Sequence, residues 1–223
     1  MDLKNKIVGI FLGLVIILPL PGFSADPEKL NMVFVPASEK GDNQDYESLI
    51  AIIETLAAIK IKPIRVTDYN AAVESMRAGR AHIAWYGGKT YIQAAEMAGA
   101  EAFAAGVRKG DDTAGYYAYF VVPVDSPLKA LDDVRGQILG LNSIGSTSGD
   151  LIPQVELMKV GLSTKNEDDF AKVFYAGSHD ACLLAAINKH VDVCGMSSRN
   201  FDARLTDGTF KLEQVRIIHR SSL

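Results

Sequence analysis

The chain has 223 residues, 48% of them hydrophobic, and a net charge of −4. A chain of this length can form one or two domains with a substantial core. The acidic balance, without a basic stripe, argues against a nucleic-acid partner. It does not exclude a small anionic ligand, because backbone N–H groups and hydroxyls can hold such a ligand without a net positive charge.

The N-terminus has the layout of a secretory signal peptide. Lys4 and Lys6 form a short basic start, and residues 7–20 are almost wholly apolar. Residues 21–25 (Pro-Gly-Phe-Ser-Ala) follow, with small residues where a signal peptidase would cut. The apolar run is about 14 residues, shorter than the roughly 20 needed to span a bilayer as a helix. We therefore predict that residues 1–25 are a cleaved signal peptide and that the mature protein is periplasmic. The alternative is an uncleaved N-terminal anchor.

In the first half of the chain, short strand signals alternate with helix signals. Apolar runs and helical spacing predict strands at 32–35, 64–66 and 81–85, and helices at 45–59, 69–76 and 89–97. A long β-rich run follows at 116–124 and is closed by Pro127. Units of this β-α type build a parallel sheet.

The second half repeats the pattern. Strands are predicted at 137–141, 170–175, 191–196 and 215–219, and helices at 128–134, 178–190, 200–205 and between the loop 142–149 and Gly161. We expect an α/β protein with two lobes, residues 26–118 and 119–223, and a ligand cleft between them.

The strongest chemical signal is the loop at residues 145–149, which reads Gly-Ser-Thr-Ser-Gly between a strand and a helix. Its three hydroxyls can donate to the oxygens of an anion, and its glycines let the backbone come close. Pro153 belongs in a first helical turn, so the regular helix is expected near Ile152, with the loop just ahead of it. The candidate ligand residues here are Ser146, Thr147 and Ser148.

A second strand-to-helix junction carries a histidine. Ser178 is a good helix N-cap, and His179 would lie in the first turn, able to donate to a bound anion. Asp180 would repel an anion if it pointed into the same cleft, or it could orient His179. The alternative is a plain helix cap with a solvent-facing histidine.

Three tyrosines, Tyr69, Tyr86 and Tyr116, stand near the ends of first-half strands. A tyrosine hydroxyl can bond an anion while the ring forms a wall of the cleft, although packing in the core or hinge would also explain aromatic residues there.

Two cysteines, Cys182 and Cys194, fall on the helix at 178–190 and the strand that follows it. Helix and strand rise bring them level with each other, and an exported protein can form a disulfide. Lying at the same height does not bring two cysteines close enough to form a disulfide, so we favour two unpaired, buried side chains.

Nothing in the sequence predicts an enzyme, a metal site or a cofactor. His82, His179, His190 and His219 show no metal-ligand spacing with another histidine or cysteine. Ser146 is one residue out of register for a Gly-x-Ser-x-Gly nucleophile elbow, and no Gly-Lys-Ser/Thr follows the loop as in a nucleotide P-loop.

Taken in order, these segments resemble the substrate-binding proteins of phosphonate/phosphite ABC transporters. The matching stretches are residues 68–70 (Asp-Tyr-Asn), 76–87 ending His-Ile-Ala-Trp-Tyr-Gly, 115–117 (Gly-Tyr-Tyr), 125–128 (Asp-Ser-Pro-Leu), 146–149 (Ser-Thr-Ser-Gly), 177–180 (Gly-Ser-His-Asp) and 188–193 (Asn-Lys-His-Val-Asp-Val). No single motif is specific, but the ordered set covers nearly all of the chain after residue 25.

The resemblance implies a type II periplasmic binding protein fold that closes on a small phosphorus oxyanion and delivers it to an ABC transporter permease in the inner membrane. It implies a ligand set of Tyr69, Tyr116, Ser146, Thr147, Ser148 and His179, with Tyr86, Asp180 and Arg199 nearby. The same fold and ligand could instead serve a sensory partner of a membrane receptor or kinase.

Two departures from the family pattern matter. Some relatives carry a glutamate for the amino group of an aminoalkylphosphonate near the place of Arg199, which would repel an ammonium. We therefore expect phosphite, methylphosphonate, phosphate or a ligand with a second anionic group. Relatives also continue past the strand at 215–219 and return to the first lobe. We expect this chain to be truncated at its C-terminus, without that return segment; the alternative is a normal short variant of the family.

Overall fold

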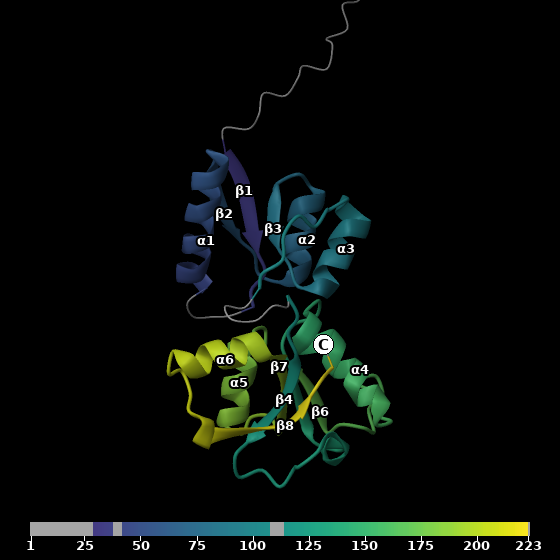
Figure 1. Ribbon diagram of the computed structural model, residues 1–223. Coiled ribbons are helices and arrows are strands. Elements are labelled where there is room, and N and C mark those ends of the chain that lie inside the picture. Colours follow the sequence, from purple (N-terminus) through teal and green to yellow (C-terminus); the bar gives the residue numbers. More distant parts are fainter. Residues whose placement is uncertain (1–28, 38–41, 108–113, 223) are drawn as a thin grey trace, which may run out of the picture.

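The computed structural model describes residues 29–37, 42–107 and 114–222. The predicted signal peptide, residues 1–25, lies outside the described residues. The described chain forms two tiers, each built on its own sheet (Figure 1). Within the three described ranges, no helix has both the length and the apolar character that a membrane span requires.

The first lobe is a three-stranded parallel sheet in the order β2-β1-β3, with helices on both sides (Figure 1). Its elements are β1 (Lys29–Phe34), α1 (Asp42–Ala57), β2 (Lys60–Arg65), α2 (Tyr69–Arg77), β3 (Ile83–Trp85) and α3 (Gly88–Ala98). The parallel sheet expected from the alternating pattern is confirmed.

Alternation along β1 explains why helices cover both faces of this sheet. Met32 and Phe34 pack against side chains of α1, and the Phe34 ring stacks on Tyr46 with centroids 3.9 Å apart. Val33 lies on the opposite face, in a cluster with Tyr69 and other residues of α2. A strand buried on both faces is the usual form in parallel sheets.

The second lobe is a mixed five-stranded sheet in the order β6-β5-β7-β4-β8. β5 pairs in parallel with β6 and β7, whereas β4 runs antiparallel to β7 and β8. The strands are β4 (Ala118–Pro123), β5 (Ile138–Leu141), β6 (Lys172–Tyr175), β7 (Val193–Ser197) and β8 (Val215–Arg220), and the helices are α4 (Ile152–Lys159), α5 (His179–Ile187) and α6 (Ser198–Thr206).

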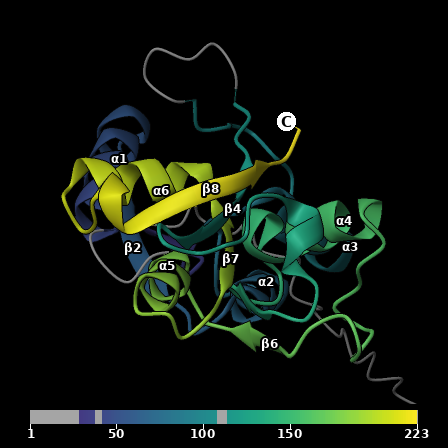
Figure 2. The ribbon, with the colours of Figure 1, turned by 90° about the horizontal axis from the view of Figure 1, so that it is seen from below.

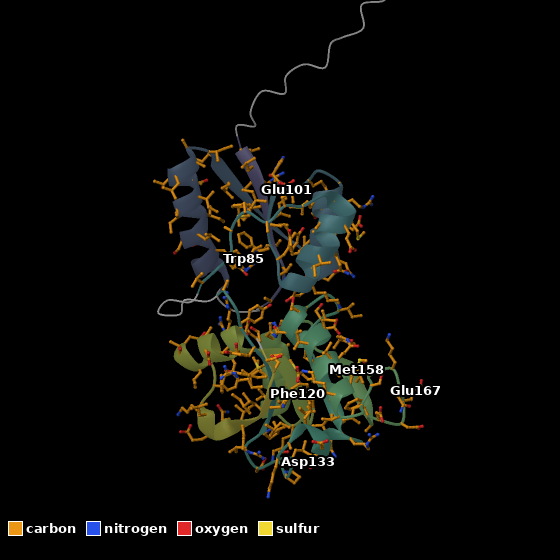
Figure 3. The ribbon with its side chains drawn as sticks, turned by 45° about the vertical axis from the view of Figure 1, so that its right-hand side comes forward. Trp85, Glu101, Phe120, Asp133, Met158 and Glu167 are labelled. Carbon is orange, nitrogen blue, oxygen red and sulfur yellow. A yellow bond between two sulfur atoms is a disulfide. The ribbon has the colours of Figure 1, made fainter. Side chains whose placement is uncertain are left out.

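This second sheet is also buried on both faces. Phe120 and Val122 of β4 pack in one cluster with Leu157 of α4, whereas Val121 packs in another with residues of α5 and α6. Figure 2 shows α4 on one side of the strands and α5 and α6 on the other. Phe120, labelled in Figure 3, is fully buried near the middle of this lobe.

The expectation of two unpaired cysteines is wrong. Cys182 of α5 and Cys194 of β7 form a disulfide, with Cα atoms 5.8 Å apart. The close approach depends on Gly140 of β5, where a Cβ would lie only 3.2 Å from the Cys182 sulfur. The missing side chain of Gly140 therefore lets α5 come near enough to β7 for the disulfide. The rise per residue of a helix and a strand could not predict this close packing.

The helix predicted at 128–134 is reduced to a single 3₁₀ turn, Leu131–Val134. The Asp133 carboxylate accepts hydrogen bonds from the backbone N–H groups of Lys129 and Ala130, which holds these two residues ahead of the turn. Such local capping competes with a longer helix.

As expected from Pro153, the regular helix α4 begins at Ile152, and the loop 145–149 lies ahead of it. Residues Thr147–Leu151 form a π-helical turn that runs directly into α4, with N–H groups bonding five residues back, Leu151 to the carbonyl of Ser146 and Ile152 to that of Thr147. Pro153 has no N–H to offer the Gly149 carbonyl, which accepts from the Asn142 N–H at 2.8 Å instead. The proline thus sets both the start of α4 and the shape of the turn before it.

Candidate functional site

The hydroxyl loop, residues 145–149, lies at the junction of the two lobes. Ser146 is buried, and its Oγ accepts from the Gly149 N–H at 3.1 Å and from the Asn142 side-chain amide at 3.2 Å. The Thr147 Oγ1 accepts from the Lys89 N–H of the first lobe at 2.9 Å. Ser148 is also buried, and within the described part of the chain its hydroxyl makes no hydrogen bond.

Asn142, which the sequence reasoning did not single out, organises this region. It is fully buried at the end of β5, and its amide nitrogen donates to the hydroxyl oxygen of Tyr69 at 3.4 Å as well as to Ser146. The backbone carbonyl of Asn142 accepts from the Gly177 N–H at 2.7 Å. Asn142 Oδ1 has no hydrogen-bond partner among the described residues. The sequence signal that could have indicated Asn142 is a polar residue directly after β5, an apolar interior strand of the sheet.

His179 is the first residue of α5 and is buried, so the solvent-facing alternative does not hold. Its Nδ1 accepts from the Ser197 N–H at 3.2 Å, which leaves the proton of the neutral ring on Nε2. Burial lowers the pKa of His179 to about 3, so the ring is neutral at physiological pH. His179 thus offers one uncharged N–H donor, held in place by backbone.

His179 and Tyr69 both pack closely against glycines of the hydroxyl loop. A Cβ on Gly149 would lie 2.8 Å from His179 Cε1, and a Cβ on Gly145 would lie 2.8 Å from the Cβ of Tyr69. Gly145 also has a φ of +102°, a conformation that glycine adopts readily.

Tyr116 reaches the same loop through a glycine of the first lobe. A Cβ on Gly87 would lie 2.9 Å from the Thr147 hydroxyl oxygen and 3.6 Å from that of Tyr116. Because Gly87 has no side chain, the two hydroxyl groups can approach the same point from opposite lobes. Five of the six predicted ligand residues therefore lie on or pack against residues 145–149, and Tyr116 lies beside them at Gly87.

The third predicted tyrosine has a different position. The Tyr86 hydroxyl donates to the Ala72 carbonyl in α2 at 3.1 Å, and burial raises its pKa to about 12. Tyr86 packs against the cluster that contains Tyr69, so it supports α2 behind the site rather than facing the loop.

Asp180 pairs with an arginine of the next helix. Its Oδ1 lies 3.6 Å from the Arg204 Nε, and both side chains are buried. The histidine is oriented by the backbone of Ser197. Pairing with Arg204 compensates the negative charge of Asp180, which reconciles it with an anion site.

Arg199 lies against Tyr116. Its guanidinium carbon is 5.2 Å from the centre of the Tyr116 ring, and its Nη2 donates to the carbonyls of Gly106 and Ala114 at 2.7 and 3.0 Å. Arg199 Nε is buried and has no hydrogen-bond partner among the described residues. Trp85 packs against Gly106, at the edge of the first lobe that faces the second (Figure 3).

A cavity of about 720 Å³ opens beside the hydroxyl loop, between α2 and the ends of β5 and β6. Asn142 and Ser143 line one side, and Asp68, Glu74 and Arg80 line the other. Two carboxylates beside one guanidinium do not favour an anion, so this cavity is not an oxyanion site of its own.

The site is a set of uncharged hydrogen-bond donors that meet at one loop. Hydroxyls and a neutral imidazole N–H can surround a tetrahedral oxyanion without covalent chemistry. Across the ranges that the structure describes, no group of three or more histidine, cysteine, aspartate or glutamate side chains could hold a metal ion.

Two α/β lobes with a donor-lined loop at their junction define the type II periplasmic binding protein fold, and solved structures share it. A binding protein component of an ABC phosphonate transporter from Pseudomonas aeruginosa superposes with a TM-score of 0.79 at 24% identity, covering 87% of this chain and 65% of that one. PhnD1 from Prochlorococcus marinus, in complex with methylphosphonate, gives a TM-score of 0.73 at 20% identity, covering 88% and 73%.

The chain belongs to the family described as "ABC transporter, phosphonate, periplasmic substrate-binding protein", whose model matches residues 32–223. It is 27% identical over 209 residues to the phosphonates-binding periplasmic protein of Escherichia coli, covering 91% of this chain and 61% of that protein. It is 28% identical over 206 residues to a phosphate-import protein of Mycolicibacterium smegmatis, covering 88% and 64%. The chain thus spans less than two thirds of the length of these relatives.

Proposed function

We propose that this protein is a periplasmic solute-binding protein, not an enzyme, that captures a phosphonate or a related phosphorus oxyanion such as phosphite or phosphate. In this proposal residues 1–25 are removed on export, and the loaded form delivers its ligand to an ABC transporter permease in the inner membrane. The family match and the ligand classes in the relatives' names support it.

The observation that carries the proposal is the convergence of both lobes on the hydroxyl loop. Tyr69 and Tyr116 approach it from the first lobe, and His179 packs on it from the second. In the proposed complex, Ser146, Thr147 and Ser148 surround the phosphorus oxygens, and the His179 Nε2–H and the tyrosine hydroxyls complete the shell. Ligand contacts from lobes 26–118 and 119–223 would then hold the cleft closed.

The double substitution Ser146→Ala with Thr147→Ala tests the loop directly. We expect the affinity for methylphosphonate to fall about a hundredfold or more, since each lost hydrogen bond to a charged group contributes about 1.5–3 kcal/mol. Titration calorimetry measures the change. Thr206→Ala is the matched control, because its hydroxyl donates to the Asp202 carbonyl within α6. Unchanged affinity in the double variant would show that the loop is not the site.

We infer further that Arg199 disfavours ligands with an ammonium group. No carboxylate pairs with its guanidinium among the described residues, and the group lies on the ring of a proposed ligand tyrosine. Removing the charge in Arg199→Gln should raise the affinity for 2-aminoethylphosphonate relative to methylphosphonate by about tenfold.

The ratio of the two affinities is the proper measure, because the substitution also removes the bonds to Gly106 and Ala114. Arg220→Gln serves as control, since Arg220 also lies over a tyrosine ring, that of the neighbouring Tyr117, at 3.4 Å from its centre. If both variants leave the ratio where the native protein has it, Arg199 does not select the ligand.

A further inference from the structure

An ion pair joins the two lobes directly beneath the hydroxyl loop. The Lys89 Nζ, at the start of α3, lies 2.6 Å from the Asp150 Oδ2 in the π-helical turn. The Asp150 side chain is 2% exposed and that of Lys89 is 22% exposed. A pair this deeply buried is sensitive to the loss of either partner, because the remaining charge is left without compensation.

The other groups that contact Asp150 are neutral and come from its own lobe. The Gly145 N–H and the amide of Gln154 donate to it, and so does the Tyr175 hydroxyl at 3.0 Å. Among the described residues, only Lys89 brings a positive charge to this carboxylate. Without the first lobe, no positive charge among the described residues of the second lobe compensates this negative charge next to the hydroxyl loop.

Two neighbouring contacts join the same parts of the two lobes. The Lys89 backbone N–H donates to the Thr147 Oγ1 at 2.9 Å, and the buried Thr90 hydroxyl donates to the Gly145 carbonyl at 2.9 Å. The start of α3 thus contacts the hydroxyl loop at its first residue, Gly145, and at its middle residue, Thr147. Separation of the lobes would break these contacts together with the ion pair.

We propose that Lys89 is a positioning residue for ligand capture, which pairs with Asp150 only when the lobes are closed. Closure would then compensate the negative charge of Asp150 beneath the hydroxyl loop. The proposal rests on the proposed function. In the open arrangement the Asp150 carboxylate opposes an incoming oxyanion. On closure the ammonium of Lys89 comes to lie beside this carboxylate. The closed form is then stabilised by the interlobe ion pair, and the hydroxyl loop can accept a dianion.

The first test is Lys89→Met, measured by titration calorimetry with phosphite and with methylphosphonate. We expect the dissociation constants of both to rise by a similar factor of about tenfold or more, because a smaller closed population weakens every ligand alike. Lys159→Met is the matched control: it removes a lysine whose Nζ lies 2.7 Å from the Glu156 carboxylate, with both partners on α4. The control should bind as the native protein does.

The Asp150→Asn background separates this role from a purely structural one. If Lys89 acts through the charge of Asp150, adding Lys89→Met to Asp150→Asn should change the affinity by less than about threefold, far less than in the native background. An equally large loss in both backgrounds would overturn the proposal.

A measurement without ligand keeps the inference separate from the proposed function. Small-angle X-ray scattering of the ligand-free proteins should give a larger radius of gyration for Lys89→Met than for the native protein and Lys159→Met. Equal radii and equal affinities for the two lysine variants would overturn the proposal. Failure of the native protein to bind either ligand would contradict the proposed function, while the scattering comparison would still report on the interlobe pair.

Discussion

Substituting Gly149 by alanine is expected to abolish ligand binding. A Cβ at this position would lie 2.3 Å from the Cβ of Asn142 and 2.8 Å from the Cε1 of His179. The Asn142 Cβ is fixed to its own backbone and cannot swing aside. Either the hydroxyl loop or the histidine must therefore move, and both are proposed ligand groups. Overpacking of this kind also destabilises a protein by about 1–3 kcal/mol.

Calorimetry with methylphosphonate and a thermal melt measure the two effects of Gly149→Ala. Gly88→Ala is the matched control, because a Cβ there meets only the Thr147 side chain at an ordinary 3.9 Å. Gly88 begins α3, where alanine is favourable. Native affinity in Gly149→Ala would mean that the close packing of Asn142, Gly149 and His179 does not shape the site.

Loss of the disulfide is expected to give the largest change in stability. Cys182 and Cys194 are 12 residues apart and fully buried. Closing a loop of this size stabilises a fold by about 3 kcal/mol in the chain-entropy model. The double variant Cys182→Ala with Cys194→Ala should therefore unfold at a lower urea concentration, with its free energy of unfolding reduced by about 2–4 kcal/mol.

Urea denaturation with and without a thiol reductant provides the control for this prediction. The reductant should lower the stability of the native protein toward that of the variant and leave the variant unchanged. The bond also ties the first turn of α5, which begins with His179, to β7, whose Ser197 N–H orients that histidine. A native protein whose stability does not respond to reductant would contradict the disulfide.

Much of this architecture could be predicted from local pattern. Period-2 and helical spacing located the strands and most of the helices, because each element buries a face whose residues recur regularly. The hydroxyl loop and His179 were recognisable because hydroxyl, glycine and helix-cap chemistry is local in sequence. The parallel first sheet followed from the alternation of strands and helices.

The features that could not be predicted are the ones that depend on contacts between distant segments. Asn142 can be read from the sequence only as a polar residue after an apolar strand, because its contact with Tyr69 joins positions 73 apart. The disulfide needed the bare backbone of Gly140, and the Lys89–Asp150 pair needed the two lobes to be placed against each other. The pairing of Asp180 with Arg204 could not be predicted because Arg204 lies on the next helix.

Titration calorimetry of the protein against phosphite, phosphate, methylphosphonate and 2-aminoethylphosphonate tests the central claim most directly. We expect binding to at least one of the first three ligands, more tightly than to the aminoalkyl compound, with the affinity lost in Ser146→Ala with Thr147→Ala. A folded protein that binds none of the four would contradict the claim that residues 145–149 form a phosphorus-oxyanion site.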